Sequence, residues 1–170
     1  MAEALAPILP GHIEELTRQV LVEASLRGFT LASAESCTGG LLASLLTDMP
    51  GHSHAFERGF VVYTNEAKTE MLGVDPALIE RHTAVSAQVA CAMAQGALAR
   101  SHAEIAVSIT GWAEAGPDPD KPAGLVHFAS ARSGRETRHR EKRFGDIGRA
   151  RLRIACLETA LQMMLDRMGD

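Results

Sequence analysis

Helical and extended patterns of apolar residues alternate along this chain. Apolar positions three and four residues apart indicate helices over residues 14–27, 39–48, 86–100 and 147–168, and capping residues start two more at Thr64 or Asn65 and at Asp75-Pro76. Short apolar and β-branched runs indicate strands over 29–34, 59–64, 105–110 and 124–129, and the charged segment 136–142 is typical of an exposed edge strand. We therefore expect an α/β fold, a layered sandwich in which a mixed sheet of about five strands is covered by helices on both faces.

Length and composition agree with one domain of ordinary globular type. The 170 residues are 46% hydrophobic and 22% charged. Two prolines and the lack of a period predict a flexible N-terminal arm over residues 1–12, followed by a single domain over 13–170. The net charge of −4 argues against nucleic-acid binding, and no run approaches the roughly 20 apolar residues of a membrane span. Three widely spaced cysteines fit neither a disulfide framework nor a zinc cluster, so we expect a cytoplasmic protein.

A turn of small residues after the first predicted strand is the centre of the pattern. It places Ser36, Cys37 and Thr38 just ahead of Gly39 and Gly40. The glycines let the backbone approach a ligand closely, and the first N–H groups of the following helix favour an anion or a developing negative charge. A nucleophile beside N–H donors is the arrangement that acyl transfer requires. The structural alternative is that Ser36 or Thr38 only caps the helix.

Polar residues also stand where two further predicted strands end. Residues 63–65, followed by Lys68, come after the second strand, and Thr110 with Gly111 closes the third. Ligands of open α/β sheets bind beyond the carboxyl ends of strands, so the three strand ends form one candidate site.

The candidate base for the serine is Lys68, at the start of a helix. None of the seven histidines lies at a strand end near the turn, and none has the spacing of a helical metal pair. A lysine serves as a base only when it is neutral, which burial at such a junction favours. Arg149 or Arg153, at the start of the last helix, could hold a substrate phosphate.

The basic run 138–143 has two interpretations. It could be a nucleic-acid patch, but with an acidic total charge a solvated edge strand is favoured.

Five blocks of the sequence resemble one known family. They are Ala34-Glu35-Ser36-Cys37-Thr38-Gly39-Gly40, the segment 59–68, His82-Thr83-Ala84-Val85-Ser86, Lys121-Pro122-Ala123-Gly124 and the segment 144–149. In this order, over about residues 13–168, they resemble the CinA carboxy-terminal domain, the nicotinamide mononucleotide deamidase (amidohydrolase) family, in a stand-alone form.

The resemblance implies hydrolysis of the carboxamide of nicotinamide mononucleotide to nicotinate mononucleotide and ammonia, in pyridine nucleotide salvage. By position, Ser36 would be the nucleophile, Lys68 its base and Tyr63 an assisting group. The substrate, a small nucleotide, would be bound by Thr38, Gly39, Gly40, Asn65, Thr110, Gly111 and Arg149. No metal or other cofactor is implied, nor a nucleic-acid or membrane partner, and a homo-oligomer (dimer or higher) is expected.

One loop departs from the pattern of the family. Where the family carries Thr/Ser-Gly-Ile-Ala-Gly-Pro and further glycines, this chain has Trp112 in place of the isoleucine and Glu114 in place of a glycine, followed by Asp118, Pro119 and Asp120. Carboxylates there would repel a phosphate. An alternative to the deamidase is therefore a catalytically silent or substrate-shifted homologue that binds a nucleotide or a partner. A third hypothesis, from another class of chemistry, is thiol catalysis at Cys37.

Overall fold

The computed structural model describes residues 9–115 and 118–170, and most of the predicted arm, residues 1–8, lies outside them. The elements follow in the order α1 (Gly11–Arg27), β1 (Leu31–Glu35), α2 (Leu41–Thr47), a short 3-10 helix η2 (Ser53–Ala55), β2 (Phe56–Val61), α3 (Asn65–Leu72), α4 (Pro76–His82), α5 (Ala87–Ala99), β3 (Ile105–Gly111), β4 (Leu125–Arg132), β5 (Arg138–Arg143) and α6 (Arg149–Met168).

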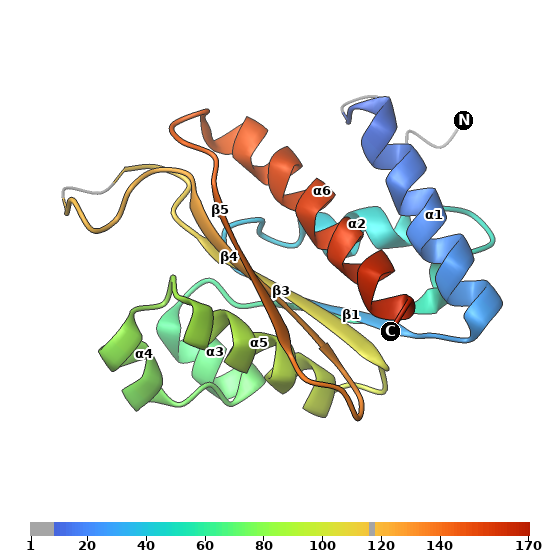
Figure 1. The fold of residues 1–170 in the computed structure, drawn as a ribbon, viewed down its shortest axis with the longest axis horizontal. Coiled ribbons are helices and arrows are strands. Elements are labelled where there is room, and N and C mark those ends of the chain that lie inside the picture. Colours follow the sequence, from blue (N-terminus) through green and yellow to red (C-terminus); the bar gives the residue numbers. More distant parts are fainter. Residues whose placement is uncertain (1–8, 116–117) are drawn as a thin grey trace.

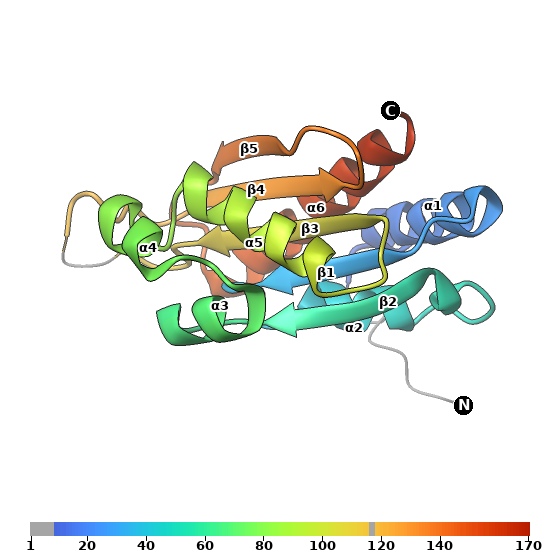
Figure 2. The same ribbon diagram turned by 90° about the horizontal axis from the view of Figure 1, so that it is seen from below.

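The strands form one mixed sheet in the order β2-β1-β3-β4-β5. β1 lies between β2 and β3 and is parallel to both, whereas β4 is antiparallel to β3 and β5. The arrows of β1, β2 and β3 accordingly point to the same end of the molecule in Figure 2. The expected mixed five-stranded α/β sheet is confirmed.

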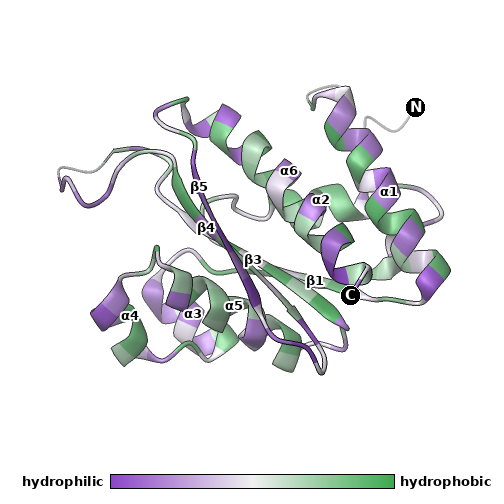
Figure 3. Ribbon diagram, in the orientation of Figure 1, coloured by the Kyte–Doolittle hydropathy of each residue, from purple (hydrophilic) through white to green (hydrophobic). Residues whose placement is uncertain are grey.

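Helices cover both faces of the sheet (Figure 1), as predicted. α1, α2 and α6 pack on one face, around side chains such as Ile105, Val107 and Phe128. On the other face, α3, α4 and α5 pack against the small side chains of Ala32, Ala34 and neighbouring strands. Figure 3 shows the apolar core strands in contrast to the hydrophilic edge strand β5. No helix within residues 9–115 and 118–170 is both long and apolar enough to cross a membrane.

The basic edge strand β5 is paired with carboxylates from α6 and its own strand. Arg140 lies 3.2 Å from Asp166, and Arg143 lies 2.7 Å from Glu141. Arg138 binds the side chain of Asp170. Since acidic groups of the same chain neutralise this run, its geometry agrees with a solvated edge.

Several predicted boundaries were wrong, each for a local reason. The second strand is β2 at Phe56–Val61 instead of 59–64, because an edge strand pairs through its backbone and tolerates polar side chains at residues 57–58. The helix predicted from residue 39 begins at Leu41, because Gly39 and Gly40 have φ angles of 62° and 93°. Residues 11 and 12, assigned to the arm, form the first turn of α1.

Close packing of α5 against α3 depends on a glycine. Gly96 lies in the interior of α5, and a Cβ atom added to it would lie only 2.1 Å from the backbone oxygen of Leu72. The helix therefore accepts the low helix propensity of glycine so that the end of α3 can approach its backbone. The contact fixes α3 against α5, and α3 carries Lys68, the predicted base.

Candidate active site

A cavity of about 390 Å³ lies at the carboxyl ends of the three parallel strands, where the loop between β3 and β4 projects (Figure 2). It is lined by Ser36, Cys37, Tyr63, Asn65, Lys68, Ala84, Val85, Thr110, Gly111, Trp112, Ala113, Glu114, Ala115 and Arg149. The residues come from five separate parts of the chain. Their convergence agrees with the general location of ligands in open α/β sheets.

Ser36 and Lys68 are in direct contact inside this cavity. Nζ of Lys68 lies 3.1 Å from Oγ of Ser36. The amine donates to the backbone oxygens of Val62, at 3.0 Å, and Tyr63, at 3.3 Å. These three contacts use every hydrogen-bonding position that a lysine amine has, and they fix it against the serine.

The sequence places Lys68 in a buried position through a helix cap. Oγ1 of Thr64 accepts a hydrogen bond from the N–H of Ala67, so α3 begins at Asn65 and turns Lys68 inward. The side chain is only 1% exposed. Burial lowers the pKa of the Lys68 amine from its ordinary value, because removing the amine from water disfavours its charged form.

The carboxylate of Glu35, which the sequence analysis did not single out, holds the turn in place. It is fully buried and accepts hydrogen bonds from the N–H groups of Gly40 at 3.1 Å, Leu42 at 3.0 Å and Ala43 at 2.8 Å. The expectation that these helix donors face a ligand is therefore wrong: they face Glu35. A carboxylate at the end of a buried strand, just before a helix start, is the signal that could have revealed this cap.

Neither Ser36 nor Thr38 caps α2 by a side-chain bond, and Ser36 is anchored by its backbone. The N–H of Ser36 donates to the backbone oxygen of Ile109 in β3, at 3.0 Å. Thr38 is buried, and its Oγ1 has no hydrogen-bond partner among the described residues. Thr38, Gly39 and Gly40 do not line the cavity, so their predicted contact with substrate has no support in this geometry.

The Cys37 side chain is buried, and no hydrogen bond joins it to Lys68 among the described residues. The neighbouring Cys156 thiol lowers the pKa of Cys37, and Cys37 in turn raises the pKa of Cys156. Both side chains belong to the buried core under α6. The amine of Lys68 contacts Ser36 instead, so the geometry favours the serine over the thiol as nucleophile.

Arg149 lies at the mouth of the cavity and is already engaged. Its Nη2 and Nε lie 3.0 and 3.2 Å from the same oxygen of Glu114. This pairing with Glu114, with a smaller contribution from the Tyr63 hydroxyl, raises the pKa of Arg149. Arg153, the alternative phosphate ligand, donates to the backbone oxygen of Cys37 at 3.0 Å and is outside the lining.

The remaining predicted residues line the cavity in different ways. Tyr63 is 66% exposed, so its ring stands at the rim. Thr110 is buried, and its hydroxyl donates to the backbone oxygen of Ala84 at 2.8 Å. Asn65 and Gly111 are part of the wall. Seven of the ten predicted site residues therefore line one cavity, and Thr38, Gly39 and Gly40 do not.

Trp112 closes the base of the departing loop and lines the cavity. Its N–H donates to the backbone oxygen of Leu125 at 2.9 Å, and its own oxygen accepts from Gly124 at 2.8 Å. Nζ of Lys121 lies 5.5 Å from the centre of its ring. These two backbone hydrogen bonds of Trp112 form the neck of the loop, where it leaves the β3–β4 pair, two residues before Glu114.

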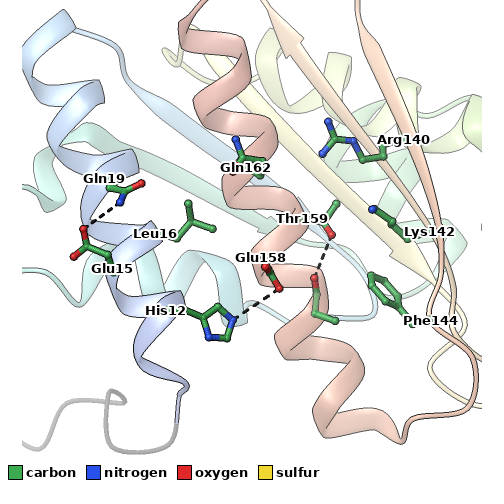
Figure 4. Close-up of a pocket in the computed structure, with 11 residues that line it drawn as sticks. His12, Glu15, Leu16, Gln19, Arg140, Lys142, Phe144, Glu158, Thr159 and Gln162 are labelled. Atoms are coloured by element: carbon green, nitrogen blue, oxygen red, sulfur yellow. Dashed lines mark hydrogen bonds and ion pairs between the residues drawn. The ribbon is translucent and has the colours of Figure 1, made fainter.

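A second hollow, of about 520 Å³, lies between α1, α6 and β5 (Figure 4). His12 and Glu158 face each other there at 3.8 Å, opposite Arg140 and Lys142 of β5. Its lining holds no serine or cysteine, and the hydroxyl of its Thr159 donates to the backbone oxygen of Ala155 at 3.2 Å, so it has no hydroxyl or thiol paired with a base. Among the described residues, no group of three or more His, Cys, Asp or Glu side chains is placed to hold a metal ion.

Comparison with known proteins gives consistent matches over nearly the whole chain. The family model described as CinA C-terminal domain matches residues 13–168. The chain is 47% identical over 164 residues to a CinA-like protein of Chlorobaculum tepidum, covering 93% of this chain and 38% of that protein. It is 46% identical over 157 residues to a CinA-like protein of Acidobacterium capsulatum, covering 91% and 37%. The chain therefore spans less than two fifths of the length of these curated relatives.

Solved structures show the same fold. The crystal structure of the competence/damage inducible protein CihA from Agrobacterium tumefaciens has a TM-score of 0.90 and 46% sequence identity, with 95% of this chain and 98% of that chain covered. A competence damage-inducible protein A (ComA) from Klebsiella pneumoniae has a TM-score of 0.86 and 31% identity, with 92% and 97% covered.

Proposed function

This chain belongs to the CinA C-terminal domain family, and from that premise we propose that it is an amidohydrolase that cleaves the carboxamide of nicotinamide mononucleotide or a related amide. The products would be the carboxylic acid and ammonia. The observation that carries the proposal is the buried contact of 3.1 Å between Nζ of Lys68 and Oγ of Ser36.

The contacts of Lys68 suit a neutral amine. A neutral amine has two N–H donors and one lone pair. The backbone oxygens of Val62 and Tyr63 accept the two donors, which leaves the lone pair to accept the proton of the Ser36 hydroxyl. Burial, which lowers the pKa of Lys68, favours the same protonation state.

The proposed reaction has two halves. Lys68 takes the proton of Ser36 while Oγ forms a bond to the carboxamide carbon, and the resulting intermediate expels ammonia with the proton that Lys68 returns. This leaves an acyl ester on Ser36. Water then attacks the ester with Lys68 again as the base, which releases the carboxylic acid and restores the serine hydroxyl.

The oxygen that becomes negative in each half needs N–H donors. Glu35 occupies the donors of α2, so they are not free for this role. The N–H of Cys37 has no backbone or side-chain acceptor elsewhere among the described residues. In serine hydrolases the N–H of the residue after the nucleophile serves as such a donor, and we assign this role to Cys37.

The test is ammonia release from nicotinamide mononucleotide, with wild type measured beside Ser36→Ala and Lys68→Ala. We expect release by the wild type and loss of it in both variants, by about a thousandfold or more. Release that persists in Ser36→Ala would contradict the mechanism. A folded wild type that binds the nucleotide and releases no ammonia would favour the silent or substrate-shifted homologue.

A further inference from the structure

The ion pair between Glu114 and Arg149 lies at the mouth of the cavity and occupies the arginine that would hold a substrate phosphate. One oxygen of Glu114 accepts from both Nη2 and Nε of Arg149, at 3.0 and 3.2 Å. These two nitrogens form the edge of the guanidinium that binds a phosphate or carboxylate through two parallel bonds. The same edge cannot serve Glu114 and a phosphate at once.

The position of Glu114 is set by its neighbours in the fold. Two backbone hydrogen bonds join Trp112 to Gly124 and Leu125 at the start of β4. They form the neck of the loop and lie two residues before Glu114. Arg149 is the first residue of α6, which has no side-chain cap. Glu114 is 68% exposed and Arg149 41% exposed, so the pair lies at the mouth of the cavity, in reach of solvent. A ligand can therefore compete with Glu114 for Arg149.

The charges at this end of the cavity nearly cancel. Arg149 contributes one positive charge and Glu114 one negative charge, while a phosphate monoester carries about −1.5 to −2 at neutral pH. A phosphate must either displace Glu114 from Arg149 or bind beside a carboxylate of the same sign. A ligand that has a neutral ribose hydroxyl in place of the phosphate neither has to displace Glu114 nor is repelled by it.

We propose that Glu114 is a specificity-determining residue that competes with the substrate phosphate for Arg149, so that the site selects less strongly for a nucleotide carboxamide over the phosphate-free nucleoside carboxamide. The inference rests on the proposed amidohydrolase function and names the substrate feature that the same site discriminates. Glu114 does not take part in bond cleavage.

The test compares Glu114→Gln with wild type on nicotinamide mononucleotide and nicotinamide riboside. Gln keeps the size of the side chain and removes its charge. We expect the ratio of kcat/KM for mononucleotide over riboside to rise roughly three- to fivefold, the upper part of the range for an exposed ion pair. The matched control is Asp120→Asn, which removes a negative charge from the same loop without an Arg149 contact, and its ratio should stay within about twofold.

A binding measurement separates failure of this inference from failure of the proposed function. In a Ser36→Ala background, calorimetric titration compares the two ligands with and without Glu114→Gln. Tighter binding of the mononucleotide alone supports the inference, whether or not the wild type releases ammonia. An unchanged ratio, an equal gain for the riboside, an equal effect of Asp120→Asn, or no binding of the mononucleotide to either variant would overturn it.

Discussion

Replacing Glu35 by Gln tests the cap that holds the nucleophile turn. Oε2 of Glu35 accepts from Gly40 and Leu42, and Oε1 accepts from Ala43 and from the hydroxyl of Ser33 at 3.2 Å. The amide of a glutamine can keep its oxygen on Gly40 and Leu42. Its NH2 group then faces the N–H of Ala43, donor against donor.

The cost follows from these contacts. The bonds from Gly40 and Leu42 become neutral, and each loses about 1 kcal/mol. The half-buried N–H of Ala43 is left without an acceptor, which costs about 1–3 kcal/mol more. The lower desolvation cost of a neutral side chain offsets part of this. We expect a loss of about 3 kcal/mol in the free energy of unfolding, which corresponds to a fall in Tm of about 6–12 °C for a chain of this length.

Urea and thermal unfolding, followed by circular dichroism, measure this change. The matched control is Glu66→Gln, which removes an exposed carboxylate from the first turn of α3 and should cost no more than about 0.5–1 kcal/mol. If Glu35→Gln were as stable as the control, the carboxylate would not be the cap of α2.

Two other predictions concern the buried base and the close helix contact. Because burial lowers the pKa of Lys68, kcat/KM should rise with pH to a plateau, with a midpoint below the ordinary value of 10.5. Between the pKa of Lys68 in the folded protein and 10.5, the unfolded chain binds one more proton than the folded one, so the free energy of unfolding should rise with pH across that window. Lys68→Met should remove this rise, and Lys142→Met, at an exposed lysine, should retain it. Gly96→Ala, which would stabilise an isolated helix by about 1 kcal/mol, should instead cost about 1–3 kcal/mol because its Cβ meets the oxygen of Leu72. Gly11→Ala, with open space around it, should not destabilise, and a gain in Tm for Gly96→Ala would refute the packing argument.

Apolar periodicity was enough to predict the layered fold and the end of the sheet that carries the site. Ser36 and Lys68 were identified because each follows a predicted strand, and parallel strands bring such ends together. The bounds of β2 were missed because an edge strand needs no apolar pattern. The homo-oligomer and the roles of the site residues stay predictions.

Contacts between distant parts of the chain could not be predicted from local pattern. Glu114 and Arg149 meet across 35 positions of sequence, and only the geometry of the β3–β4 loop over α6 brings them together. Glu35 was overlooked for another reason: a charged residue at the end of a strand usually faces solvent, whereas this one turns inward because three helix N–H groups repay its burial.

The hydrogen bond from the N–H of Ser36 to the backbone oxygen of Ile109 makes the position of Ser36 independent of the loop between β3 and β4. It ties Ser36 to the body of β3, ahead of the two Trp112 hydrogen bonds at which the loop with Glu114 leaves the sheet. Insertions and substitutions beyond Trp112 can then accumulate without disturbing the dyad. A substitution in the loop can therefore change which ligand the cavity accepts while the contact between Ser36 and Lys68 stays in place.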